Sequence, residues 1–152
     1  MKNEGLGLGH RWARRFCVGL TLFSLSSFFL FACSRDTVCD TPFGEGATID
    51  IGMPDFAALQ NVGGTVTVNR GYKGIFVRRM GYGEFVAFEC ACPGCHEVRL
   101  LPLEGWDGGV LECPECHSHY ETVNGQPLEG AVSGCPLYQY NTHFDGYVLT
   151  IY

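Results

Sequence analysis

Two short cysteine motifs constrain the fold of this chain more than any other feature. Cys92-Pro-Gly-Cys95 and Cys113-Pro-Glu-Cys116 have the same form, and a histidine follows each of them at once. A Cys-x-x-Cys turn directs two sulfurs toward one point, and two such turns can supply four thiolates in a tetrahedron. The repeat therefore predicts that these two turns, the first and second knuckle, meet at one metal centre.

The first 33 residues have the order of a bacterial secretory leader. Basic residues precede an uncharged, mostly apolar run from Phe16 to Ala32, and Leu30-Phe-Ala-Cys33 closes it. A charged start, an apolar core and a small residue before the cut are typical of such leaders. The Leu-x-Ala-Cys ending resembles the lipobox of bacterial lipoproteins. This resemblance implies a leader over residues 1–32, acylation of Cys33 and an exported lipoprotein anchored to a membrane of the cell envelope. A short uncleaved membrane anchor is the alternative.

The charge balance bounds the partners of the mature chain. Removing the leader, which contains Lys2, Arg11, Arg14, Arg15 and Glu4, leaves six basic and fifteen acidic side chains, a net charge of −9. Nucleic-acid binding depends on Lys and Arg that neutralise phosphates, so no nucleic-acid partner is expected. For the same reason we expect membrane contact through the N-terminal lipid rather than through an anionic surface.

The rest of the chain reads as a tether followed by one small β domain. Residues 33–46 contain turn formers and acids without periodicity, which is typical of a flexible tether. Residues 47–152 contain short β-branched segments separated by turn signals such as Asn124-Gly125 and Asp145-Gly146. Only Pro54–Gln60 fits a helical turn or two. The pattern predicts an all-β sandwich or partly open barrel.

The segment from Val86 to Tyr152 resembles a Rieske-type iron–sulfur domain. The similarity rests on Phe-Glu-Cys-Ala-Cys-Pro-Gly-Cys (88–95), on Cys-Pro-Glu-Cys-His-Ser-His-Tyr (113–120), on residues 125–130 and on the closing Gly-Tyr-Val-Leu-Thr-Ile (146–151). The resemblance implies a Rieske-like β fold with metal-binding loops at 90–96 and 113–119. It also implies an iron centre, either [2Fe–2S] or mononuclear, and electron transfer with a redox protein partner.

The ligands depart from the Rieske pattern. The two positions that carry iron-binding histidines in that family are Cys92 and Cys116 here. A Rieske centre has two imidazoles on one iron, so these loops cannot build it. The knuckles are similar instead to those of rubredoxins and zinc ribbons.

Two ligand sets remain open at this stage. Cys92, Cys95, Cys113 and Cys116 would hold one tetrahedral Zn²⁺ or iron ion. Replacing Cys95 with Cys90 would keep the Rieske spacing and hold an all-cysteine [2Fe–2S] cluster. Disulfides within or across the knuckles are a third interpretation. Cys39, Cys90 and Cys135 lie outside the knuckles, and in an oxidising compartment two of these three are expected to pair.

Two functions follow, and neither requires a catalytic residue. His96, His117 and His119 are interpreted as imidazoles beside the centre, with ligation by one of them as the alternative. No phosphate loop, serine elbow or carboxylate pair stands out, so an electron carrier or accessory protein is expected rather than a stand-alone enzyme. The alternative is a non-catalytic β module that a structural zinc ion stabilises.

Overall fold

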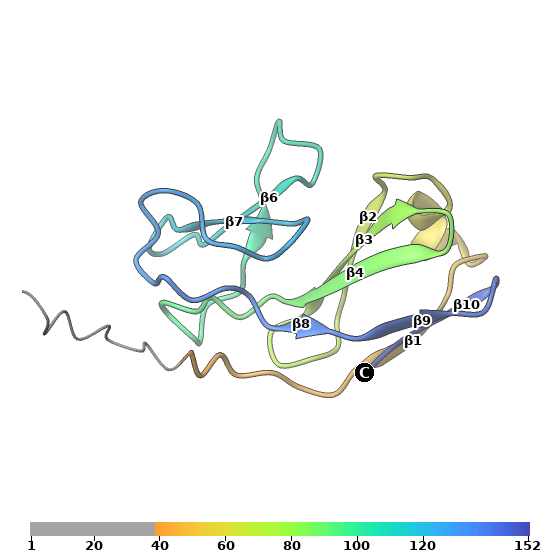
Figure 1. Ribbon diagram of the computed structural model, residues 1–152, viewed down its shortest axis with the longest axis horizontal. Helices are drawn as coiled ribbons and strands as arrows, with labels where there is room; N and C mark the ends of the chain where they lie inside the picture. Colours follow the sequence, from red (N-terminus) through yellow and green to blue (C-terminus); the bar gives the residue numbers. More distant parts are fainter. Residues whose placement is uncertain (1–38) are drawn as a thin grey trace, which may run out of the picture. The chain divides into compact units, whose positions relative to one another are not determined.

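Short β-branched and aromatic segments form ten strands in residues 39–152, the part of the chain that this computed structural model describes (Figure 1). The predicted leader and Cys33 lie outside these residues. The strands are β1 Ala47–Asp50, β2 Thr65–Val68, β3 Ile75–Gly81, β4 Glu84–Glu89, β5 Leu101–Pro102, β6 Val110–Glu112, β7 His119–Glu121, β8 Gln139–Tyr140, β9 Thr142–Phe144 and β10 Val148–Ile151. All strand pairs are antiparallel, and the predicted all-β class is confirmed.

Two of the three sheets form the base of the domain. One has the order β1-β10-β9 and the other the order β2-β3-β4-β8. Their apolar residues meet in one core, in which Ile49 and Leu149 come from the first sheet and Val77 and Ala87 from the second. Burial of such side chains is the main stabilising contribution to the base.

One short helix closes this core. The segment Pro54–Gln60 forms a 3-10 helix with proline in its first turn, as the sequence predicts. Leu59 is fully buried in the base core. The Arg79 guanidinium donates to the carbonyls of Leu59 and Gln60, each at 3.0 Å, and so satisfies groups that a helix end leaves open. Within residues 39–152, no helix is long and apolar enough to cross a membrane.

The third sheet, β5-β6-β7, carries the knuckle lobe, which comprises residues 90–137. Its strands are only two or three residues long. A second apolar cluster underlies it, to which Leu100, Leu111 and Tyr120 contribute together with Cys92 and Cys113. Cysteine sulfurs are therefore part of the packing of this lobe.

Residues 40–46, in the segment expected to be a tether, run along the base before β1. The Phe43 ring stacks on Tyr138 with 4.1 Å between ring centroids. Glycine is required at 46, because a Cβ there would lie 1.8 Å from the Ile151 carbonyl oxygen. The chain is thus held against the sheets from Phe43 onward.

One predicted strand is divided by tertiary structure. The segment 137–144 reads as continuous, but β8 pairs with β4 whereas β9 pairs with β10. Asn141 lies between them, and its backbone exchanges hydrogen bonds with Tyr152 at 2.9 and 3.0 Å. The chain changes sheets at this residue, which a local pattern does not encode.

Candidate metal centre

The two knuckles are built by equivalent backbone turns. In the first, the His96 amide donates to the Cys92 carbonyl at 2.7 Å, and in the second the His117 amide donates to the Cys113 carbonyl at 2.9 Å. Both histidines have positive φ, 46° at His96 and 53° at His117. This left-handed conformation reverses the chain after the second cysteine of each turn and returns it toward the sheet.

Strands hold each knuckle in place. The first knuckle follows β4, where Ala91 forms a bridge with Arg99 and the Cys92 amide donates to the Val98 carbonyl at 3.0 Å. The second knuckle connects β6 to β7, and the Cys113 amide donates to the Ser118 carbonyl at 3.0 Å. Backbone hydrogen bonds therefore hold the chain at each knuckle, and with it the two cysteines of that knuckle.

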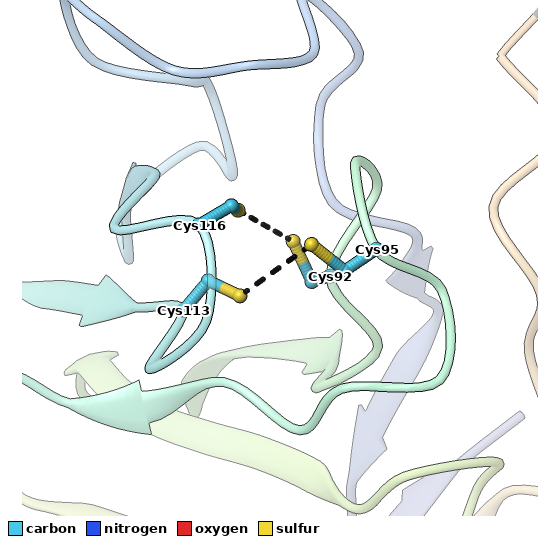
Figure 2. A group of neighbouring side chains, drawn as sticks. All are labelled: Cys92, Cys95, Cys113 and Cys116. Carbon is cyan, nitrogen blue, oxygen red and sulfur yellow. Dashed lines mark hydrogen bonds between the residues drawn. The ribbon is translucent and has the colours of Figure 1, made fainter.

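The four knuckle sulfurs converge (Figure 2). The Sγ atoms of Cys92, Cys95, Cys113 and Cys116 all lie within 4.8 Å of one another. Two cross-knuckle contacts are shorter, 3.7 Å from Cys92 to Cys116 and 4.0 Å from Cys113 to Cys95. Cys92 and Cys113 are fully buried, whereas Cys95 and Cys116 are partly exposed. The predicted meeting of the two loops is confirmed.

These separations suit one tetrahedral ion. A metal with bonds of about 2.3 Å to sulfur holds its four sulfurs about 3.8 Å apart. In a two-iron cluster, cysteine sulfurs bound to different irons lie on opposite sides of the cluster. The six distances among the four sulfurs would then not all be short. The donor set consists of thiolates, which suit zinc and iron. The residues present therefore fit a single Zn²⁺ or iron ion.

Ionisation differs among three of the knuckle thiols, those of Cys92, Cys95 and Cys116. Burial opposes ionisation of Cys116, but hydrogen bonds from Ser118 and from the neighbouring thiols outweigh it and lower the Cys116 pKa to about 6. The Cys95 pKa is raised, mainly by its hydrogen bond with Cys116 and then by burial. Burial raises the pKa of Cys92. Cys116 thus presents a thiolate to an incoming cation more readily than Cys92 or Cys95 does.

Cys90 lies outside this group of sulfurs. It directly follows β4, is 1% exposed, and its amide donates to the Gly74 carbonyl at 2.8 Å. Burial raises the Cys90 pKa to about 12. Cys90 is thus not one of the four cysteines whose sulfurs lie within 4.8 Å of one another.

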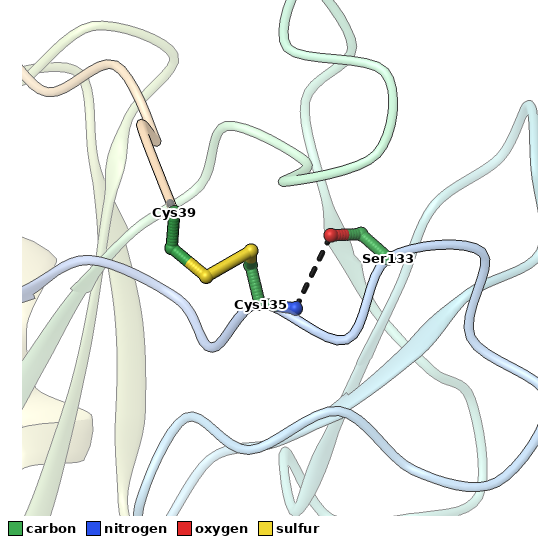
Figure 3. The surroundings of a disulfide bond; sticks show 3 residues. All are labelled: Cys39, Ser133 and Cys135. Atoms are coloured by element: carbon green, nitrogen blue, oxygen red, sulfur yellow. Dashed lines mark hydrogen bonds between the residues drawn. A yellow bond between two sulfur atoms is a disulfide. The ribbon is translucent and has the colours of Figure 1, made fainter. Parts of the chain in front are cut away.

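The remaining two cysteines of the described chain form a disulfide. Cys39 and Cys135 are bonded, with 5.5 Å between their Cα atoms and a sequence separation of 96 (Figure 3). The sequence left open which of the three extra cysteines pair. Nothing in a single sequence fixes that choice, because it depends on where the chain before β1 lies against the knuckle lobe.

The knuckle histidines lie at the surface. His117 Nδ1 is 3.0 Å from Glu112 Oε1, and His119 Nε2 is 3.8 Å from the same oxygen. The group of close potential ligand atoms contains only the four cysteine sulfurs. No ring nitrogen of His96, His117 or His119 belongs to it. This agrees with imidazoles beside the centre.

Two polar residues of the 113–120 motif, Ser118 and Tyr120, lie near the sulfurs, but the motif alone does not indicate what they contact. Ser118 is fully buried, and its Oγ lies 3.2 Å from Cys116 Sγ. The Tyr120 hydroxyl is buried, and no group within residues 39–152 forms a hydrogen bond with it. The alternation of β7 could have located both, since residues 118 and 120 lie on the face opposite the partly exposed His119 and Glu121.

Comparisons with known proteins give little further information. The chain matches no protein-family model and no curated protein. Among solved structures, it is similar to the ferredoxin of carbazole 1,9a-dioxygenase from Nocardioides aromaticivorans IC177, at 18% identity and a TM-score of 0.40, over 60% of this chain and 86% of that one. A chain from a complex of reduced oxygenase and oxidized ferredoxin in carbazole 1,9a-dioxygenase gives 26% identity and a TM-score of 0.42, over 58% and 87%. With scores this low, the likeness assigns neither fold nor function.

Proposed function

We propose that Cys92, Cys95, Cys113 and Cys116 bind one metal ion, and that the protein is a Rieske-like electron carrier that acts with a redox protein partner. One observation carries the proposal, namely that four sulfurs from two loops lie within 4.8 Å of one another. A centre closed by four thiolates has no open position for water or substrate. This favours electron transfer or a structural role over hydrolysis.

The four cysteines differ in burial, which suggests that two of them shield the centre and two face a partner. Cys92 and Cys113 are fully buried and would shield the centre from water, whereas Cys95 and Cys116 reach the surface. A bound iron ion would supply a one-electron couple. An electron partner would therefore approach the side of the lobe on which Cys95 and Cys116 are partly exposed.

A structural zinc site is the second candidate, and a separate observation favours it. The sheet of the knuckle lobe has strands of only two or three residues, and Cys92 and Cys113 belong to its apolar cluster. A lobe with so little core gains stability when metal binding supplies part of its folding free energy.

Metal analysis with visible spectroscopy separates these candidates. The protein is purified anaerobically, its metal and thiol content are measured, and spectra are recorded before and after reduction by dithionite. The electron-carrier proposal expects one iron per chain and visible absorption that bleaches on reduction and returns on oxidation. A colourless protein with one zinc per chain would replace it with the structural role. The absence of any metal, or two irons with sulfide, would refute the single-ion site.

We also propose that the protein is an exported lipoprotein of the bacterial envelope, cut before Cys33 and anchored through it. The leader pattern of residues 1–33 supports this proposal, and so does the Cys39–Cys135 disulfide, since disulfides persist mainly in oxidising compartments. Cells are labelled with a fatty-acid analogue, and wild type is compared with Cys33→Ala. Label in wild type alone is expected, and equal labelling of both proteins would disprove the anchor.

A further inference from the structure

Residues 126–135, here called the cover loop, lie against both knuckles. The Leu128 amide donates to the His119 carbonyl at 2.9 Å, just after the second knuckle. At the first knuckle, a Cβ on Gly94 would lie 3.6 Å from Val132 Cβ and 3.7 Å from Ser133 Cβ, which is ordinary contact. The position of this loop therefore affects the surroundings of the sulfurs from both sides.

Within the cover loop, the Val132 amide is linked to the sulfur of Cys116 by the hydroxyl of Ser118. The Val132 amide donates to Ser118 Oγ at 2.9 Å, and that oxygen lies 3.2 Å from Cys116 Sγ. When Cys116 is a thiolate it can only accept, so the Ser118 hydroxyl becomes the donor. Because its oxygen already accepts from Val132, its proton is left to point toward the sulfur.

The far end of the cover loop is tied to the base. The Cys135 amide donates to Ser133 Oγ at 3.2 Å, and the Cys135 sulfur is bonded to Cys39 (Figure 3). The segment that follows Cys39 is itself fastened to the base. The Gly44 amide donates to the Tyr140 hydroxyl at 3.2 Å, and the Glu45 carbonyl accepts from Gly71 at 2.9 Å. The disulfide thus joins the cover loop to a fixed part of the domain.

We propose that the Cys39–Cys135 disulfide is a positioning element of the metal centre: it fixes the cover loop so that the Val132 amide holds the Ser118 hydroxyl on the Cys116 sulfur. This inference rests on the proposed metal site. A hydrogen bond to a ligating thiolate withdraws negative charge from the sulfur and so favours the reduced metal. Without the disulfide, the four thiolates remain, but the reduction potential falls.

A double-mutant cycle on iron-loaded protein tests this coupling. Cys39→Ser/Cys135→Ser removes the disulfide, Ser118→Ala removes the hydroxyl, and the triple variant combines them. The midpoint potential is measured for each, together with the charge-transfer spectrum of Co²⁺-loaded protein. The disulfide-free variant and Ser118→Ala are each expected to have a lower midpoint potential than wild type and shifted cobalt bands. The triple variant is expected to change by less than the sum of the two, because both changes act through one hydrogen bond.

A matched control separates positioning from general stability. Leu59→Ala removes a fully buried side chain from the base core, away from the knuckle lobe. It is expected to lower the melting temperature without moving the potential or the cobalt bands. If the disulfide-free variant does not fold, the disulfide is reduced in folded wild type with a phosphine, and the two new thiols are counted.

Two results would overturn the inference while leaving the proposed function intact. One is a potential and cobalt spectrum unchanged by loss of the disulfide in protein that retains one metal per chain. The other is strict additivity of the disulfide and Ser118→Ala shifts. Failure of wild type to bind one metal per chain is a different result, and it would refute the proposed function together with this inference.

Discussion

At the scale of single residues, Cys95 and Cys90 distinguish the two ligand sets. Cys95 Sγ lies within the sulfur group, whereas the Cys90 thiol is buried outside it. We expect Cys95→Ser to abolish metal retention, and Cys90→Ser to leave one metal per chain. Metal binding free energy at such sites is folding free energy, on the order of 10 kcal/mol. Metal content after gel filtration and thermal melts of both variants measure the difference.

The same pair of variants contains its own control. Serine replaces one sulfur by one oxygen at each position, so the two changes are chemically matched. Cys90→Ser is expected to cost only about 1–3 kcal/mol of unfolding free energy, the penalty for burying a hydroxyl. If Cys95→Ser retained the metal and Cys90→Ser lost it, the result would instead support the ligand set with Rieske spacing, in which Cys90 replaces Cys95.

His96 tests whether a knuckle imidazole binds the metal. Its φ of 46° is one that glycine adopts freely, and its side chain is exposed. We expect His96→Gly to keep one metal per chain and to change the unfolding free energy by no more than about 1 kcal/mol. Relief of the left-handed strain opposes the greater chain entropy of glycine. Metal titration with a competing chelator measures this, and a weakening beyond tenfold would show that His96 is a ligand.

At the scale of elements, a buried carboxylate joins β4 to the turn before β3. Glu89 is fully buried, and its oxygens accept from the Tyr72 amide at 2.7 Å, the Lys73 amide at 2.8 Å and the Tyr140 hydroxyl at 2.7 Å. Gly71 is required beside it, because a Cβ there would lie 2.6 Å from Glu89 Oε2. One side chain therefore fastens three segments of the base.

We expect Glu89→Gln to destabilise the protein by about 2–4 kcal/mol, because an amide group presents N–H where one of these three donors already points. Chemical denaturation followed by fluorescence measures the change. Exposed Glu84→Gln at the start of the same strand is the control and should cost less than about 0.5 kcal/mol. Similar losses for both variants would contradict the role given to the buried carboxylate.

The elements that the sequence predicted are those with local signals. The alternation at 65–68, the proline start of the 54–60 helix and the doubled knuckle each encode their own structure, and β2, the 3-10 helix and the sulfur group follow. The change of sheet at Asn141 and the Cys39–Cys135 bond are set by contacts between segments far apart in sequence. Ser118 and Glu89 become meaningful only once the surrounding strands are placed.

At the scale of the whole molecule, two thiol chemistries coexist in one domain. One disulfide and five free cysteines are present in the described residues. The separation of 3.7 Å between the Cys92 and Cys116 sulfurs is close enough that an oxidant could join them after small movements. A bound metal would protect these thiolates, so in an oxidising compartment metal binding and disulfide formation support the same fold.

The two apolar clusters predict how the molecule responds to loss of metal. The base core contains no cysteine, whereas the cluster under the knuckle lobe includes Cys92 and Cys113. We expect a chelator to open the lobe first, because its folding free energy depends on the metal. Amides of β6 and β7, such as Leu111 and Tyr120, should exchange on the order of a hundredfold faster, while the exchange rate of the Val77 amide in β3 should change little.

Hydrogen exchange with mass spectrometry measures both regions in one sample, and Zn²⁺ added back under reducing conditions should restore protection. Uniform loss of protection across both clusters would show one cooperative unit, and no loss in either would show that the four thiols stabilise the lobe without a metal.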